Sequence, residues 1–173
     1  RPKTDEYLEQ KLEEVEKRFQ ALEGRLSDPA LAARPQELRA LSKERADMLA
    51  LVERWGSVKG RTITYVGDGN NVAASLAQAS AMLGMHVRVA TPEGFELNNN
   101  LAASVTRVAR FGATLAQSHD PGAAVKDADA VYTDAWASMG QEDDAERRAG
   151  IFKPFQVNAA LMAAAGSQAL FMH

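Results

Sequence analysis

The stretch Thr62-Ile63-Thr64-Tyr65-Val66-Gly67-Asp68-Gly69-Asn70-Asn71 decides the fold of most of this chain. Its first five residues, which are mainly β-branched or aromatic, predict a buried strand. The glycine-containing turn after the strand leads into an Ala-rich segment that predicts a helix over 71–83, closed by Gly84. A strand, a tight turn and a helix in this order are typical of an alternating α/β domain.

The same alternation continues through the rest of the sequence. Further strands are predicted at 86–90, 114–117, 130–133 and 169–172, and helices at about 99–110, 123–128 and 157–165. Because parallel strands are joined by right-handed helical crossovers, these elements predict a five-stranded, doubly wound, Rossmann-like parallel sheet. We expect the strand order 3-2-1-4-5.

The chain changes character near Trp55-Gly56. Residues 1–55 hold 11 of the 20 Lys and Arg residues and 12 of the 23 Asp and Glu residues. Apolar residues recur there at steps of three and four in two segments separated by Pro29 and Pro35, which predicts an antiparallel helical hairpin, or coiled coil. The residues of this apolar seam are Leu8, Leu12, Val15, Phe19, Leu22, Leu26, Leu38, Leu41, Met48, Val52 and Trp55. We therefore expect two domains, residues 1–55 and 56–173, with the hairpin packing on the sheet domain or pairing in a homodimer.

Composition excludes several classes of function. The sequence has no cysteine, so it has neither disulfides nor thiolate metal ligands. No apolar run approaches the roughly 18 residues of a membrane span, and a net charge of -3 among 173 residues provides no field that would attract nucleic acid. We expect a soluble, cytoplasmic protein whose first residue, Arg1, is a processed end.

Ligands of doubly wound sheets bind beyond the carboxyl ends of the strands, where three segments carry polar residues. The first, Gly67-Asp68-Gly69-Asn70-Asn71-Val72, imitates a dinucleotide-binding fingerprint, but Val72 replaces its third glycine. The second strand also ends in Ala90-Thr91-Pro92, without an acidic residue for a ribose, so we expect no nicotinamide cofactor. The side-chain amide of Asn71 suits a substrate carboxylate or ammonium group, and it suits a helix cap equally well.

The other two segments follow the fourth and fifth strands. Asp134 would pair with an ammonium group, while Ser138 and the neighbouring backbone would bind polar ligand groups. The alternative is an aspartate that caps a loop beside a surface tryptophan. His173 ends the last strand and, taken alone, is an exposed terminal histidine.

Read together, five segments of residues 56–173 resemble the second domain of ornithine carbamoyltransferase. They are Gly67–Val72, Ala90–Glu96, Tyr132–Glu142, Ile151–Asn158 and Phe171–His173. The resemblance implies that Asn71 and the Ser138-Met139 backbone bind the α-carboxylate of ornithine and that Asp134 pairs with its α-ammonium. Asn70 would support the turn. No metal or cofactor is implied.

The sequence also departs from that family. There His173 begins a His-Cys-Leu-Pro turn, of which only the histidine is present, and the Ser-Thr-Arg-Thr loop that binds carbamoyl phosphate is absent. These departures lead us to expect no catalysis.

Residues 5–55 resemble the amino-terminal helical domain of bacterial peptide chain release factors, notably in Leu22–Pro29 and Leu38–Glu44, but the chain has no Gly-Gly-Gln motif. We therefore expect a non-catalytic, recombined or engineered chimera. The alternatives are a weak ornithine-binding or amino-acid-binding module, an active ornithine carbamoyltransferase, and an unrelated activity.

Overall fold

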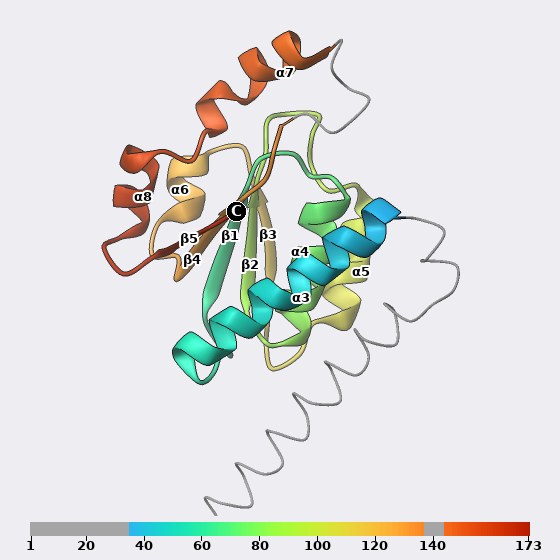
Figure 1. The fold of residues 1–173 in the computed structure, drawn as a ribbon, viewed down its shortest axis with the longest axis vertical. Helices are drawn as coiled ribbons and strands as arrows, with labels where there is room; N and C mark the ends of the chain where they lie inside the picture. The colour runs from blue at the N-terminus through green and yellow to red at the C-terminus, as the bar shows by residue number, and fades with distance from the viewer. Residues whose placement is uncertain (1–34, 137–143) are drawn as a thin grey trace, which may run out of the picture. The chain divides into compact units, whose positions relative to one another are not determined.

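The computed structural model describes residues 35–136 and 144–173 (Figure 1). The chain divides into two compact units, Arg1–Ser57 and Val58–His173. In the first unit the structure describes helix α3 (Pro35–Trp55), which corresponds to the second helix of the expected hairpin. The first helix of that hairpin lies outside the described residues, so the hairpin remains an expectation.

The second unit is built on a parallel sheet. Its strands are β1 (Thr62–Val66), β2 (His86–Ala90), β3 (Leu115–Ser118), β4 (Ala130–Thr133) and β5 (Leu170–Met172). The order β3-β2-β1-β4-β5 confirms the predicted topology. Strand order reverses between β1 and β4, which pair from Ile63↔Ala130 to Val66↔Thr133. A sheet of this kind binds its ligands beyond such a reversal.

Helices cover both faces of this sheet. Figure 1 shows α4 (Asn71–Met82) and α5 (Asn99–Val108) on one face, and α6 (Pro121–Val125) and α8 (Ala159–Ala165) on the other. Helix α7 (Ala145–Phe152), followed by a 3-10 turn at Lys153–Phe155, lies beyond the carboxyl ends of the strands. The loops after β1, β2 and β4 therefore have α7 as a neighbour.

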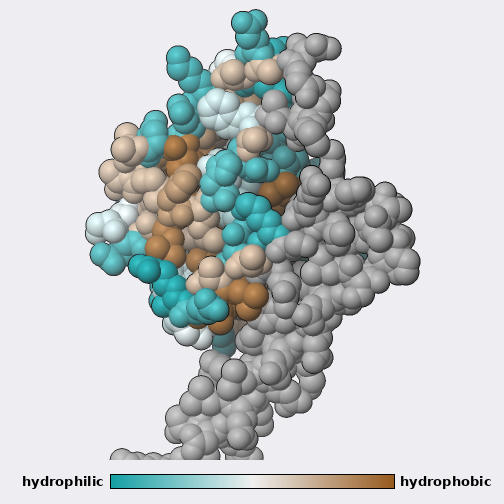
Figure 2. All heavy atoms as spheres, viewed as in Figure 1, coloured by the Kyte–Doolittle hydropathy of each residue, from teal (hydrophilic) through white to brown (hydrophobic). Residues whose placement is uncertain are grey.

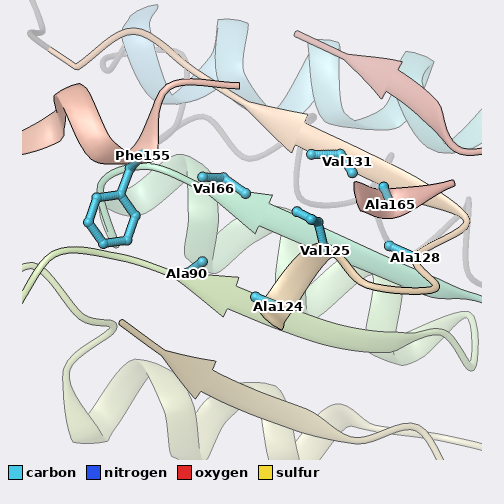
Figure 3. Packing of buried hydrophobic residues seen from close by; sticks show 8 residues of the cluster. All are labelled: Val66, Ala90, Ala124, Val125, Ala128, Val131, Phe155 and Ala165. Carbon is cyan, nitrogen blue, oxygen red and sulfur yellow. The ribbon is translucent and has the colours of Figure 1, made fainter. Parts of the chain in front are cut away.

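Alternate residues of each strand build the core between the sheet and α6 and α8. Strand side chains from β1, β2 and β4 meet apolar residues of the helices there, and Figure 3 shows the group: Val66, Ala90, Ala124, Val125, Ala128, Val131, Phe155 and Ala165. Each large side chain buried in this way contributes roughly 1.5–3 kcal/mol. Tyr65 and Ile63 alternate with Val66 along β1 and are also buried, which leaves the central strand covered on both faces.

The structure corrects several predicted boundaries. Strand β3 begins one residue later than predicted, and α8 begins at Ala159 because Asn158 caps it, accepting a hydrogen bond from Leu161 N at 3.0 Å. Helix α6 ends at Val125 rather than at 128, since its C-cap Lys126 leaves the helical region with φ -56° and ψ 127°, and Asp127 then adopts a positive φ of 57°.

Helix α7 was not predicted at all. Its buried residues are Arg148 and Phe152. Because one of these two inward-facing positions is an arginine, the helix lacks the apolar periodicity by which helices are predicted.

Apolar side chains also reach the surface beside the edge strand β5. Phe171 is 55% exposed, and Figure 2 shows apolar residues gathered on the side of the molecule where α8 and β5 lie. Among the residues that the structure describes, no helix is long and apolar enough to cross a membrane.

Candidate functional site

The carboxyl ends of β1, β2 and β4 bring three loops to one edge of the sheet. Val66, the last residue of β1, is in register with Ala90 on one side and Thr133 on the other. The residues that follow these strands therefore begin at the same level. We call this edge, formed by residues 67–71, 91–98 and 134–136, the carboxyl edge.

The turn after β1 separates the roles of two neighbouring asparagines. Asn70 is the N-cap of α4, and its side-chain Oδ1 accepts hydrogen bonds from Val72 N at 2.9 Å and Ala73 N at 3.2 Å. Asn71 is the first helical residue and is exposed. Since Asn70 performs the capping, the side-chain amide of Asn71 is available to a ligand at the helix N-terminus.

Gly69 is the second glycine of the turn that imitates a dinucleotide-binding fingerprint. A Cβ added at this glycine would lie 2.4 Å from Phe95 O and 2.6 Å from Leu97 N. Gly69 N also donates a hydrogen bond to Phe95 O at 2.8 Å. In a dinucleotide-binding turn the second glycine lets the pyrophosphate approach, whereas here this space is filled by the backbone of the loop after β2. Gly69 therefore allows the loop after β1 to pack closely against the loop after β2.

Asp134 follows β4 directly and is half-buried at the carboxyl edge. On the neighbouring strand, the buried ring of Tyr65 stacks on Tyr132 with 6.1 Å between ring centroids. The pKa of Tyr65 is raised well above its usual value, first because burial disfavours the phenolate and then because of the negative charges on Asp134 and Asp68. Two carboxylates therefore act on one buried ring.

The charge of Asp68 is matched by a residue that the sequence analysis did not select. Arg148 of α7 donates a hydrogen bond from Nη2 to Asp68 Oδ2, and the two side chains are 7% and 18% exposed. Within the described residues, no cation is placed against Asp134 in the same way. At the carboxyl edge, the Asp68 carboxylate is thus compensated by a cation, whereas that of Asp134 has the charge to receive one.

Aromatic rings surround the Arg148 guanidinium. Its Cζ lies 5.2 Å from the ring centroid of Phe95 and 5.0 Å from that of Phe152. Phe95 and Phe152 meet edge to face at 4.9 Å, and Trp136 stacks on Phe152 at 6.2 Å. The sequence holds only a weak signal for this cluster, the four-residue spacing of Arg148 and Phe152 on one face of a helix.

The remaining predicted site residues divide into two groups. Ser138 and Met139 lie outside the described residues. His173 is exposed and stands one position beyond Met172, which is in register with Tyr132, so it lies at the same edge as Asp134 but one strand away. The structure therefore brings Asn71 and Asp134 to neighbouring strand ends, at the reversal of strand order.

A metal centre has no basis in the part of the chain that the structure describes. No group of three or more His, Asp or Glu side chains converges there in a way that would hold an ion. The chemistry available at the carboxyl edge is that of a carboxylate, a side-chain amide and a helix N-terminus, which suit a zwitterionic ligand.

Comparison with known proteins points in the same direction. Residues 59–173 match the protein-family model for the Asp/Orn-binding domain of aspartate/ornithine carbamoyltransferase. The ornithine carbamoyltransferase of Pyrococcus horikoshii is 50% identical over 129 residues, which are 74% of this chain and 41% of that protein. The chain thus spans about two fifths of the length of the curated relatives that it matches.

Solved structures agree with these matches. The structure of ornithine carbamoyltransferase from Pyrococcus furiosus superposes with a TM-score of 0.70 at 49% identity, over 75% of this chain and 42% of that one. The enzyme from Gloeobacter violaceus gives 0.66 at 38% identity, over 75% and 42%. The family match excludes residues 1–58, so neither the release-factor resemblance of residues 5–55 nor the expected chimera gains support from it.

Proposed function

We propose that this chain, which belongs to the aspartate/ornithine carbamoyltransferase family through its Asp/Orn-binding domain, binds ornithine or a closely related amino acid at the carboxyl edge. The observation that carries the proposal is the placement of Asp134 and Asn71 on the loops after β4 and β1, the neighbouring strands between which strand order reverses. A zwitterionic amino acid needs one acceptor and one set of donors close together, and the pairing of β1 with β4 supports such an arrangement of Asn71 and Asp134.

Each residue has a distinct role in this proposal. Asp134 accepts hydrogen bonds from the α-ammonium group, because the charge of Asp68 is already matched by Arg148. Asn71 donates its side-chain amide to the α-carboxylate, assisted by the partial positive charge at the N-terminus of α4. Asn70 holds the turn as the N-cap, and the Ser138-Met139 backbone completes the carboxylate site. His173 is a supporting residue at the same edge.

Binding, rather than catalysis, is the activity that we propose for these residues. Carbamoyl transfer requires carbamoyl phosphate to be held in attack geometry against the amine, an effect worth up to roughly 7–11 kcal/mol. At the carboxyl edge the only described buried cation is Arg148, and its charge is engaged by Asp68. An assembly that supplied a phosphate site would use this edge as the acceptor side of carbamoyl transfer.

The unit Arg1–Ser57 carries a separate proposal. Its apolar residues recur at coiled-coil spacing in the sequence, and on that pattern we propose that the unit pairs two copies of the chain. Met48 and Leu51 of α3 are themselves buried and are not counted as part of the pairing surface. Sedimentation of the full chain and of a chain without residues 1–55 tests this pairing. Dimers that persist without the helical segment contradict it.

Titration of the full chain with ornithine, followed by amide chemical shifts in NMR, tests the proposed binding. We expect a dissociation constant near 1 mM, equivalent to about 4 kcal/mol, and shifts concentrated in residues 67–71 and 134–136. Asp134→Asn keeps the shape of the side chain and should abolish binding, because the ammonium loses its counter-charge. Glu93→Gln removes an exposed carboxylate from the same edge and should leave the affinity unchanged. Equal loss in both variants would mean that only the general negative field attracts ornithine.

A further inference from the structure

Arg148 is the most deeply buried charged residue of the described chain, with 6% of its surface exposed. Its ion-pair partner, Asp68, lies 80 residues earlier in the sequence. Two charges taken out of water lose much of their hydration energy, and their mutual attraction does little more than offset that loss. Net stability is therefore a weak reason for an arginine at this position, and the contacts that it makes suggest another.

The guanidinium connects all three loops of the carboxyl edge. Nη2 donates to Asp68 after β1, and Nε donates to the backbone carbonyl of Trp136 after β4, at 2.5 Å. The ring of Phe95, in the loop after β2, lies 5.2 Å from Cζ. A planar, forked donor makes these contacts from a single orientation, which a lysine ammonium cannot do.

The atoms that Arg148 holds stand next to the proposed ligand-binding residues. Asp68 precedes Asn71 by three residues, within the turn that Gly69 presses against the loop after β2. Trp136 follows Asp134 by two. Fixing Asp68 and the Trp136 carbonyl to one rigid group therefore limits the distance between Asn71 and Asp134.

The ion pair also sets the charge of the edge. Together with burial, the negative charges of Asp134 and Asp68 both raise the pKa of the buried Tyr65 hydroxyl. Without a cation beside either of them, the carboxylates of Asp68 and Asp134 would repel each other, and both would compete for the ammonium group of a ligand. Because Asp68 is bonded to Arg148, its negative charge has a cationic partner, whereas that of Asp134 does not have one among the described residues.

We propose that Arg148 is a positioning residue for the amino-acid site: it fixes the loop after β1 to the loop after β4 and neutralises Asp68, so that Asp134 alone receives the ammonium group. The inference rests on the proposed binding of an amino acid at this edge. It adds a residue from α7 that touches no ligand and acts through Asp68 and Trp136.

Hydrogen–deuterium exchange of the full-length chain tests the positioning role without a ligand. The amide of Gly69, bonded to Phe95 O, reports on the loop after β1, and the amides of Ile63–Val66 report on the sheet. In Arg148→Gln we expect faster exchange at Gly69 and at residues 134–136, with the sheet amides still protected. Arg147→Gln is the matched control, because Arg147 is the neighbouring arginine, is exposed, and pairs with Asp144 on the surface; exchange should not change.

Ornithine titration of the same variants tests the charge role. Arg148→Gln should lower the affinity by about tenfold, the equivalent of one charge-assisted hydrogen bond. Asp68→Asn should also lower it, because the Arg148 cation then competes for Asp134. The double variant Asp68→Asn/Arg148→Gln leaves neither charge unpaired and should recover part of the affinity, which a purely structural role does not predict.

The two measurements separate failure of this inference from failure of the proposed function. Absence of ornithine binding by the unmodified chain refutes the proposed function, while exchange at Gly69 still decides whether Arg148 holds the loops. Unchanged loop exchange in Arg148→Gln, or equally faster exchange throughout the sheet, overturns the positioning role. Affinities that fall further in the double variant than in either single variant overturn the charge role.

Discussion

Two arginine–aspartate pairs flank β1, one at each end, and they differ in their surroundings. Before the strand, Arg61 Nη1 lies 2.7 Å from Asp129 Oδ1, and the two side chains are 37% and 31% exposed. After the strand, Asp68 pairs with Arg148, and these side chains are 7% and 18% exposed. The same two residue types are thus solvated at one end of the sheet and largely dehydrated at the other.

The hydrogen bonds around each pair show what the difference means. Asp129 Oδ2 accepts a hydrogen bond from Thr62 N at 2.8 Å, so the exposed pair aligns the start of β1 with the chain entering β4. The buried pair bonds to no strand and instead joins loops. Solvated charge at the amino end stabilises the scaffold modestly, whereas the dehydrated pair at the carboxyl end joins the loops at which we propose that the ligand binds.

Removal of the buried cation should have the largest effect on stability. Arg148→Met leaves Asp68 in a mainly buried place without its partner, and the expected loss is about 3 kcal/mol. The midpoint of urea unfolding, followed by far-UV circular dichroism, measures it. Asp68→Asn/Arg148→Met should recover part of the loss, since no buried charge is then left unpaired. An exposed ion pair is worth up to about 1 kcal/mol. If Arg148→Met lost less than this, the Asp68–Arg148 pair would not differ in energy from the exposed Arg61–Asp129 pair.

Closing the space at Gly69 should have the next largest effect. In Gly69→Ala the new methyl group meets backbone atoms rather than a flexible side chain, so the two loops must separate at a cost of about 1–3 kcal/mol. Ornithine binding should weaken as well, since the turn carries Asn71. Gly150→Ala is the matched control: nothing lies within 4 Å of its added Cβ, and alanine in a helix should stabilise by up to about 1 kcal/mol. Similar melting temperatures for both variants would contradict the close approach.

The scaffold was more predictable than the loops for a physical reason. Strands β1, β2 and β4 begin and end where predicted, because each is a short β-branched or aromatic run, a signal contained in the residues themselves. Strand order followed from the handedness of crossovers, which does not depend on sequence detail.

The carboxyl edge depends on partners that are distant in sequence. Asn70 and Asn71 are chemically identical neighbours, and only the backbone conformation of Asn70, with φ -82° and ψ -168°, assigns the cap to it. The pairing of Arg148 with Asp68 spans 80 residues and leaves no periodic pattern. Sequence reasoning thus selected Asn71 and Asp134 as candidates but missed the residue that holds their loops.

Breaking the exposed Arg61–Asp129 pair should lower the free energy of unfolding by a smaller amount, and high salt should abolish this difference. Arg61→Met should cost about 0.2–1 kcal/mol, because the charges at the start of β1 remain solvated. In about 1 M NaCl, where the screening length falls to roughly 3 Å, the difference from the unmodified chain should shrink toward zero. The deficit of Arg148→Met should persist in the same salt. Urea midpoints at two salt concentrations measure both, and equal salt sensitivity of the two variants would contradict the proposed difference in hydration.

The smallest expected effect concerns another carboxylate of the carboxyl edge, Glu96. Its pKa lies below the ordinary value, chiefly because the backbone N–H groups of Glu96 and Gly94 donate hydrogen bonds to it, and further because His119 Nε2 lies 3.3 Å from Oε1. A carboxylate whose folded-state pKa is depressed adds stability at pH values above its unfolded pKa and loses it as the pH falls through the folded value. Glu96→Gln should therefore lower the melting temperature slightly at pH 6. The gap should begin to narrow near the ordinary glutamate pKa of about 4.3 and should close only below the depressed folded-state pKa. Melting curves at intervals between about pH 3 and pH 6, a range that brackets the ordinary glutamate pKa, provide the measurement. A gap that stays constant across this interval would show that Glu96 acts through shape alone, and the edge would then owe its ordering to Arg148 and Gly69 without help from this carboxylate.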